Sequence, residues 1–386
     1  MDDENYPDSR IVMTKYGSVL GRRLIHEGER QVDAFQGIPF AEPPVGRLRF
    51  RKPLPLEPWE GVKVTKSFSP VAIQLGQVGP TSEDILYLNV FTPVWKASSA
   101  SGFAVLVFIH GGGYAIGSAR KFGDIGICRN LCTKDVVVVT MQYRIGYLGF
   151  FSTGDEECPG NLALWDQLLA LKWVKENISQ FDGDPENITL MGHSSGACCV
   201  DLLSLSPYSR DLFSRMILMS GNAECAWALR HDMVEVSRSF TRKLGLSGDL
   251  SSREVMEKLR DVPSDQFALG TPNRNNPTCT VRREVGPCYD NDFLPEMDRV
   301  HIISQIQCDV SSERLEDPED DEQRIRQAKR RLALPPHDVT TAQKYMTFYR
   351  MTDLISRLTN VEVEEISAGG HGIMGTQITP HCPRCL

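Results

Sequence analysis

Residues 188–205 read Ile188-Thr189-Leu190-Met191-Gly192-His193-Ser194-Ser195-Gly196-Ala197-Cys198-Cys199-Val200-Asp201-Leu202-Leu203-Ser204-Leu205. The first four residues, apolar except for Thr189, are typical of a buried strand, and residues 196–205 read as a helix. The five residues between them, 192–196, leave room only for a tight turn. The stretch therefore predicts a strand, a sharp turn that carries Ser194, and a helix.

The same alternation of strand and helix extends over residues 103–221. Residues 103–109 are a continuous apolar run and predict a fully buried strand, and 162–181 predict an amphipathic helix with apolar residues at helical spacing. Alternation of this kind indicates an α/β fold with a mostly parallel central sheet and helices on both faces. Further predicted strands are 136–139 and 213–219, a mainly helical region is 230–262, and glycine-punctuated pieces in 11–60 predict an antiparallel N-terminal lead-in to the same sheet.

Length and composition describe a globular chain. The chain has 386 residues, of which 41% are hydrophobic and 24% charged, and its formal net charge is −8. This balance excludes collagen-like and globally disordered chains, and the acidic net charge argues against nucleic acid as a partner. Residues 11–300 are predicted to form the core, and 301–386 a divergent segment with an acidic run followed by a basic run, best explained as solvated charge.

Ser194 lies in a Gly-x-Ser-x-Gly sequence, which is weak evidence alone but specific between a predicted strand and a predicted helix. Such a turn brings backbone segments so close that Gly192 and Gly196 must lack side chains. It also holds the serine in a strained conformation at the sheet edge, over the positive end of the helix. An ordinary Gly-Ser turn is the alternative interpretation.

A second element, His110-Gly111-Gly112-Gly113-Tyr114, follows the strand predicted at 103–109. Consecutive glycines let backbone N–H groups converge on one point, as the developing oxyanion of acyl transfer requires. The predicted donors are the N–H groups of Gly112, Gly113 and Ser195. A phosphate-binding loop is the alternative, but no Lys-Ser/Thr pair follows the glycines.

The sequence resembles the type-B carboxylesterase/cholinesterase family of α/β-hydrolases. The resemblance runs from about residue 12 to 296, in the order of the family. It is carried by 35–41 with 43–46, 82–90, 110–114, 142–150, 160–197, and 286–287 with 290–295.

The resemblance implies an α/β-hydrolase fold with Ser194 as the nucleophile. It also implies two structural ion pairs, Arg49–Glu83 and Arg144–Asp184. The cysteine that is usual in one segment of the family is Ile85 here, and its probable partner region has Ala72, so one family disulfide is absent.

The base and the acid of a catalytic triad are less clear. In this fold both follow the serine, with the acid preceding the base. His371, in Ala368-Gly369-Gly370-His371-Gly372, is the candidate base, with a flexible glycine-rich tail as the alternative. The other histidines after the region of resemblance are His301, His337 and His381. No Glu-Gly dipeptide, the usual setting of the acid, follows Ser194, and no acid is assigned.

These features predict a serine carboxylic ester hydrolase that acts on small, uncharged esters through an acyl-enzyme, with neither cofactor nor metal. The alternative is a catalytically deficient or truncated esterase-like protein that keeps the fold for binding. Only 192 residues follow Ser194, and the resemblance implies longer chains, so the half that supplies base and acid is expected to be compressed or missing.

The sequence also gives expectations about the cellular compartment and the redox state of the cysteines. Residues 1–16 are polar and acidic and lack the apolar core of a signal peptide, and no apolar run is long enough to span a membrane, which predicts a cytoplasmic protein. The 11 cysteines have no framework spacing and are expected to be reduced. Cys382 and Cys385 lack the further ligands of a zinc site.

Overall fold

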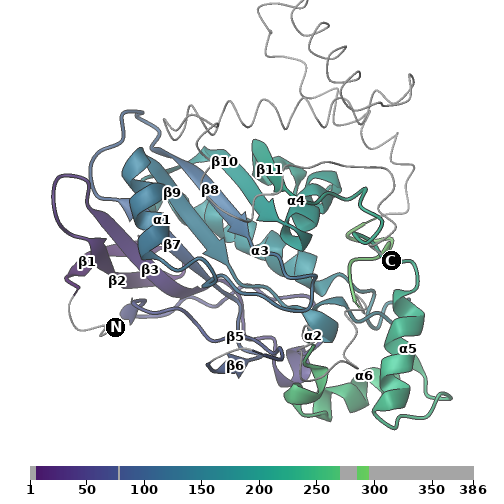
Figure 1. The fold of residues 1–386 in the computed structure, drawn as a ribbon. Coiled ribbons are helices and arrows are strands. Elements are labelled where there is room, and N and C mark those ends of the chain that lie inside the picture. Colours follow the sequence, from purple (N-terminus) through teal and green to yellow (C-terminus); the bar gives the residue numbers. More distant parts are fainter. Residues whose placement is uncertain (1–5, 77–78, 270–284, 295–386) are drawn as a thin grey trace, which may run out of the picture. The chain divides into compact units, whose positions relative to one another are not determined.

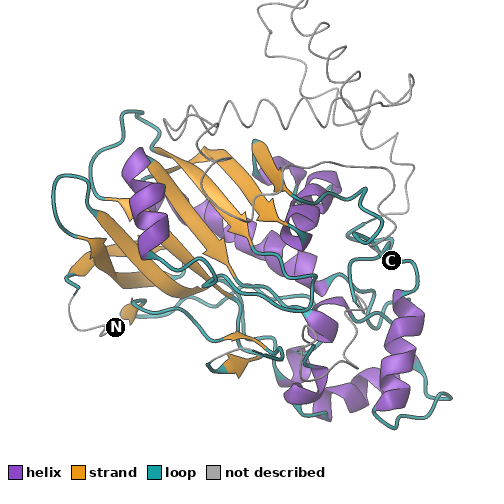
Figure 2. Cartoon of the chain, in the orientation of Figure 1, coloured by secondary structure: helices purple, strands orange, loops and turns teal. Residues whose placement is uncertain are grey.

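A computed structural model of the chain describes residues 6–76, 79–269 and 285–294, and the centre of this part is a nine-stranded sheet (Figures 1 and 2). Eight of the strands follow one path in the order β1-β2-β3-β7-β9-β8-β10-β11, and β4 pairs with β2 beside this path. Two very short strands, β5 (Val71–Ala72) and β6 (Thr81–Ser82), form a separate pair. All described residues belong to one compact unit of the chain.

One half of the sheet is parallel and confirms the strands predicted around Ser194. It consists of β9 (Val136–Met141), β8 (Phe103–Ile109), β10 (Gly183–His193) and β11 (Arg215–Met219). β9 is buried throughout, whereas every second residue of β8 is only half-buried, so the prediction of a fully buried strand at 103–109 is wrong in detail. The carboxyl ends of these strands share one edge of the sheet, where Ser194 follows β10.

The other half is antiparallel and consists of β1 (Asp8–Thr14), β2 (Gly17–Ile25), β3 (Val32–Pro39) and β7 (Tyr87–Pro93). β7 also pairs antiparallel with β9, whereas β4 (Val62–Val64) runs parallel to β2. The predicted antiparallel lead-in is therefore confirmed, and it extends further than residue 60. Over the described residues the sheet is mixed.

Helices cover both faces of the sheet, as predicted (Figure 1). Val137 and Val139 of β9 face a core that includes α3 (Leu162–Asn177) and α4 (Ser195–Leu205). Val136 and Val138 face the opposite core, to which Cys128 of α1 (Ile125–Asn130) contributes. This division follows from the alternation of side chains along a strand.

The remaining helices surround the sheet. The region predicted as helical, 230–262, contains α5 (Met233–Lys243) and α6 (Ser252–Asp261). A short helix, α2 (Gly146–Phe150), follows β9, and the 3-10 helices are η2 (Gly46–Leu48), η3 (Cys132–Lys134), η4 (Ile178–Phe181), η5 (Arg210–Leu212) and η6 (Ser264–Phe267). No helix in the described ranges is both long and apolar enough to cross a membrane.

Helix α3 differs from the amphipathic helix predicted at 162–181. It ends at Asn177, and η4 continues to Phe181. Its polar residues Asp166 and Gln167 are fully buried, because α3 packs against β10, α2 and α4 rather than exposing one side to solvent.

The two expected ion pairs have different outcomes. Arg49 and Glu83 form the predicted pair, with Nη2 at 2.5 Å and Nε at 2.7 Å from the two carboxylate oxygens. The pair Arg144–Asp184 is wrong, because Arg144 binds the carboxylate of Asp166 instead. Arg144 follows the carboxyl end of β9, whereas Asp184 lies near the amino end of β10, about 20 Å away along the sheet.

The segment 285–294 is fastened to the same core. The side-chain amide of Asn161 donates to the carbonyl oxygen of Cys288 at 2.7 Å and accepts from its backbone N–H at 2.9 Å. Ser206 donates through its hydroxyl to the carbonyl oxygen of Phe293 at 2.9 Å. These bonds anchor the last described segment beside the start of α3 and the end of α4.

The positions that lack the family disulfide are apolar core positions here. Ile85 and Ala72 are both buried in the main core. The cysteines in the described part of the chain are reduced: Cys128, Cys132, Cys158, Cys198, Cys199, Cys225 and Cys288.

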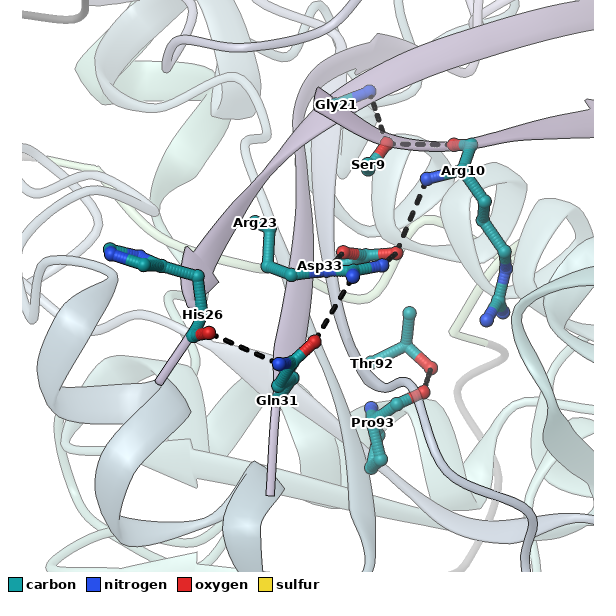
Figure 3. Close-up of polar contacts among 9 residues, drawn as sticks. All are labelled: Ser9, Arg10, Gly21, Arg23, His26, Gln31, Asp33, Thr92 and Pro93. Atoms are coloured by element: carbon teal, nitrogen blue, oxygen red, sulfur yellow. Dashed lines mark hydrogen bonds and ion pairs between the residues drawn. The ribbon is translucent and has the colours of Figure 1, made fainter. Parts of the chain in front are cut away.

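Polar contacts fix the antiparallel half of the sheet, as Figure 3 shows. The carboxylate of Asp33 is fully buried and pairs with the guanidinium of Arg23 at 2.9 Å. It also accepts a longer hydrogen bond, 3.4 Å, from the backbone N–H of Arg10 in β1. Because one side chain joins β3 to both β1 and β2, it helps to define the register of this edge.

Candidate active site

Ser194 occupies the predicted sharp turn between β10 and α4. Its backbone has φ 57° and ψ −124°, a conformation that costs energy for any residue with a side chain. The turn is held by the N–H of Ser194, which donates to the carbonyl oxygen of Met219 at 2.8 Å, and by the N–H groups of Ala197 and Cys198, which donate to the carbonyl oxygen of Ser194 at 2.9 and 3.1 Å. The sequence predicted this strained turn, although not its bond to β11.

Three glycines make the turn sterically feasible. A Cβ atom on Gly192 would lie 2.3 Å from the carbonyl oxygen of Gly196, and one on Gly196 would lie 2.3 Å from that of Ile109. This confirms the prediction that both positions require glycine. Gly221, which the sequence analysis did not single out, is equally constrained, since its Cβ would lie 2.5 Å from the carbonyl oxygen of Ser194. The only local signal for Gly221 is its position two residues after the end of β11.

The glycine loop after β8 lies directly beside Ser194. A Cβ on Gly111 would approach the carbonyl oxygen of His193 to 2.2 Å and the Cβ of Ser194 to 3.2 Å. Gly112 and Gly113 have φ values of 135° and 60°, in the region that favours glycine. The N–H groups of Gly112, Gly113 and Ser195 form no hydrogen bond with any residue that the structure describes. Three candidate oxyanion donors are thus unengaged next to Ser194.

Tyr114 fastens the end of this loop. The residue is 1% exposed, and its φ of 65° continues the left-handed backbone of the two glycines before it. Its hydroxyl donates to the carbonyl oxygen of Ala228 at 3.0 Å, and its carbonyl accepts from the N–H of Gly146 at 2.7 Å. Its own N–H reaches the hydroxyl of Ser195 at 3.3 Å. These contacts connect the loop to three separate segments, and no sequence pattern predicts them.

Gln74 holds the same loop further along. Its side-chain amide donates to the carbonyl oxygen of Gly117 at 2.9 Å and accepts from the N–H of Gly117 at 2.8 Å. These two hydrogen bonds satisfy both backbone polar groups of Gly117, as pairing with a neighbouring strand would do. Gln74 was not predicted from the sequence, because it is a single glutamine 43 residues before Gly117 and belongs to no recognisable motif.

His110 is a structural residue of the loop. Its ring is 1% exposed, stacks on the ring of Tyr143 at a centroid distance of 4.4 Å, and lies 3.0 Å from the carbonyl oxygen of Gly111 through Nδ1. Burial lowers the pKa of His110 to about 4, so the imidazole is neutral at physiological pH. His110 is thus held in place by stacking and burial at the start of the loop.

His193 precedes Ser194 and is half-buried. Burial and then the nearby charge of Lys121 lower its pKa. The hydroxyl of Ser194 forms no hydrogen bond with any described residue, so neither His193 nor His110 contacts it as a base. His371, the candidate base, lies outside the described residues and stays a prediction.

No group of three or more His, Cys, Asp or Glu side chains that would suit a metal ion occurs among the described residues. The groups that the structure brings together beside Ser194 are its hydroxyl, a set of backbone donors and the amino terminus of α4. Such a set suits attack on a carbonyl carbon, because the donors are placed where negative charge develops on the carbonyl oxygen.

Comparison with known proteins assigns the sequence to a family. The sequence model of the "Carboxylesterase family" matches residues 8–311. The chain belongs to the carboxylesterase family. Its fold is accordingly that of an α/β-hydrolase.

Several similar proteins are named esterases or carboxylesterases. Esterase cest-33 of Caenorhabditis elegans is 46% identical over 248 residues, which cover 61% of this chain and 45% of that protein. Gut esterase 1 of Caenorhabditis briggsae is 38% identical over 291 residues, 74% of this chain and 50% of that protein. Carboxylesterase 1C of Mus musculus is 44% identical over 228 residues, 55% of this chain and 40% of that protein. The chain thus spans half or less of the length of these relatives.

Proposed function

We propose that this chain is a serine carboxylic ester hydrolase that works through an acyl-enzyme on Ser194. The observation that carries the proposal is the juxtaposition of a strained serine and three unengaged N–H groups at one edge of the sheet. The esterase and carboxylesterase names of the relatives support a carboxylic ester as the substrate class. We extend the proposal to small, uncharged esters.

The reaction proceeds in two halves. The hydroxyl of Ser194 loses its proton to a base and attacks the ester carbonyl carbon, while the N–H groups of Gly112, Gly113 and Ser195 bind the oxyanion. Collapse of the tetrahedral intermediate expels the alcohol and leaves an acyl-Ser194 ester, which water then hydrolyses. We assign the base to His371, and the carboxylate behind it to a residue that we do not name.

The alternative is an esterase-like protein that keeps the fold for binding and does not turn over. One observation motivates it: among the residues that the structure describes, none contacts the Ser194 hydroxyl as a base. A protein of this kind would retain the oxyanion loop and lack deacylation.

A fluorophosphonate probe separates these functions, because it reacts with an activated serine and needs no turnover. We expect the folded chain to be labelled and Ser194→Ala to remain unlabelled. Ser204→Ala is the matched control on the same helix, since its hydroxyl bonds the carbonyl of Asp201, and it should be labelled normally. Equal labelling of the Ser194→Ala variant would contradict the assignment of the nucleophile.

Hydrolysis of p-nitrophenyl butyrate completes the test. Turnover that disappears in both Ser194→Ala and His371→Ala supports the active esterase. Labelling of Ser194 without turnover supports the binding protein, and turnover that survives His371→Ala contradicts His371 as the base.

A further inference from the structure

Two thiols meet directly behind the nucleophile. Cys198 is buried on α4, one helical turn after Ser194, and Cys225 is half-buried in the loop after β11. The thiol of Cys198 donates to the carbonyl oxygen of Asn222 at 3.1 Å, and the backbone N–H of Cys225 donates to the same oxygen at 3.2 Å. The thiol of Cys225 lies 3.6 Å from the side-chain oxygen of Asn222. Asn222 is therefore a hydrogen-bond partner of both cysteines.

The two thiols share Asn222 as a hydrogen-bond partner, one through the backbone oxygen and the other through the side-chain oxygen. The neighbouring Cys225, followed by burial, raises the pKa of Cys198 well above its usual value. Cys225 is the more exposed of the two cysteines. Closing a disulfide requires the sulfur atoms to approach to about 2.05 Å, and the loop that carries Cys225 has to supply this movement.

We propose that Cys198 and Cys225 form a reversible disulfide that regulates the active site at Ser194. The regulatory part of this proposal rests on the esterase function proposed above. The oxidant is hydrogen peroxide, and the reductant is a dithiol.

The chemistry balances in two steps. The half-buried thiol of Cys225 attacks the peroxide oxygen, which gives a sulfenic acid on Cys225 and one water molecule. The sulfur of Cys198 then attacks the sulfur of Cys225, its proton leaves with the hydroxide, and a second water molecule is released. The two thiols together lose two electrons and the peroxide gains them.

Oxidation of Cys198 would affect the proposed catalytic elements through hydrogen bonds of α4. The backbone N–H of Cys198 donates to the carbonyl oxygen of Ser194, so the nucleophile and Cys198 share one helical turn. Helix α4, which carries Cys198, also meets the oxyanion loop at Ser195, whose hydroxyl accepts from the backbone N–H of Tyr114 at 3.3 Å. A disulfide removes the thiol donor from Asn222 and draws the sulfur toward Cys225. It therefore displaces the elements that position both Ser194 and the loop.

A second thiol pair provides an internal comparison. Cys128 and Cys132 lie at the junction of α1 and η3, and both are fully buried in the core on the opposite face of the sheet. Cys132 also lies 3.6 Å from the carbonyl oxygen of Phe91. Because neither thiol of this pair is exposed to an oxidant, we expect it to stay reduced in the folded protein.

The experiment uses the full chain, titrated with hydrogen peroxide under native conditions, quenched by alkylation and mapped by non-reducing peptide mass spectrometry. We expect a linked peptide pair containing Cys198 and Cys225. In parallel, kcat for p-nitrophenyl butyrate should fall about ten- to a hundredfold and return on treatment with dithiothreitol. Cys225→Ser should keep the basal kcat and resist peroxide.

Cys199 supplies the control for the position of the link. It is adjacent to Cys198 and equally buried, but its side chain is rotated by about 100° around the helix. Cys199→Ser should keep the linked peptide, whereas Cys198→Ser should lose it.

Absence of the 198–225 link after peroxide treatment, or a link at 128–132 that forms first, would overturn the proposal. A link that leaves kcat unchanged would overturn the regulatory role. Peptide mapping does not depend on activity, so a chain that forms the link without hydrolysing any ester would contradict the proposed function and not the disulfide.

Discussion

The backbone N–H of Ser194 donates to the carbonyl oxygen of Met219 at 2.8 Å. Met219 is the last residue of β11, so the candidate nucleophile is held by the strand beside its own as well as by the turn that it belongs to. The peptide after the strand continues this contact, because Gly221 packs against the carbonyl oxygen of Ser194. The geometry of the turn therefore depends on residues 219–221, which follow it by about 25 positions in the chain.

Gly221→Ala tests this dependence. The new Cβ would lie 2.5 Å from the carbonyl oxygen of Ser194, so the backbone of one or both segments must move. We expect a loss of about 1–3 kcal/mol in the free energy of unfolding and a lower rate of fluorophosphonate labelling. Urea denaturation and labelling kinetics measure the two effects.

Gly248→Ala is the matched control, because a Cβ there meets no atom within 4 Å. It should unfold at the wild-type urea concentration. Equal behaviour of the two variants would mean that the turn tolerates displacement of residue 221.

The pH dependence of stability should report the burial of His110. Its pKa is about 4 in the folded chain and about 6.5 in the unfolded chain. The unfolded state therefore binds more protons between these values, so this contribution is complete above about pH 6.5 and is lost as the pH falls toward 4. The shift corresponds to about 3 kcal/mol.

His110→Asn retains a donor for the carbonyl of Gly111 and removes the titration. We expect its stability to fall less than that of the wild type between about pH 7 and about pH 5, as measured by urea denaturation. His26→Asn, an exposed position, should retain the wild-type difference. An unchanged pH dependence in His110→Asn would show that His110 is not the group responsible.

Local sequence patterns predicted the parts of the site whose causes are local. The requirement for glycine at 192 and 196 follows from a tight turn, and it is met by distances of 2.3 Å to backbone atoms. The parallel strands next to this turn could be predicted equally well, because apolar runs that alternate with helices indicate a parallel sheet.

Contacts between distant segments could not be predicted in the same way. Gln74 binds Gly117 through both amide atoms, and Arg144 selects the carboxylate of Asp166 over that of Asp184. Each choice depends on which end of a strand a residue occupies, and the spacing of residues in one sequence does not encode this. The burial of Asp166 and Gln167 likewise reflects packing on several sides of α3, which overrides the apolar pattern.

Arg49→Lys should show that the buried ion pair with Glu83 needs a guanidinium. Besides the carboxylate, Nη1 of Arg49 donates to the carbonyl oxygens of Leu259, Arg260 and Val262 at the end of α6. Lysine keeps the charge and cannot satisfy both partners, so we expect a loss of about 2 kcal/mol or more in urea denaturation. Arg253→Lys, in an exposed pair with Glu257, should change stability by less than about 0.5 kcal/mol. A comparable loss in both variants would contradict this role of Arg49.

Tyr114→Phe separates positioning of the oxyanion loop from packing. The substitution keeps the ring and its contact with Phe150, and removes the hydroxyl that donates to the buried carbonyl oxygen of Ala228. An unpaired buried acceptor costs about 1–3 kcal/mol, and the loop loses one of its anchors. We therefore expect lower stability together with a fall in kcat for p-nitrophenyl butyrate that exceeds any change in KM, because the oxyanion forms only after binding.

Tyr208→Phe removes a hydroxyl of the same kind from an exposed tyrosine that bonds Asp292, and it should leave both kcat and stability close to the wild type. If Tyr114→Phe changes KM alone, its hydroxyl contributes to substrate binding. If it lowers stability without affecting kcat, the hydroxyl serves packing between the loop and residues 223–228, and the position of the Gly112 and Gly113 donors must be fixed by Gln74 and Gly146 instead.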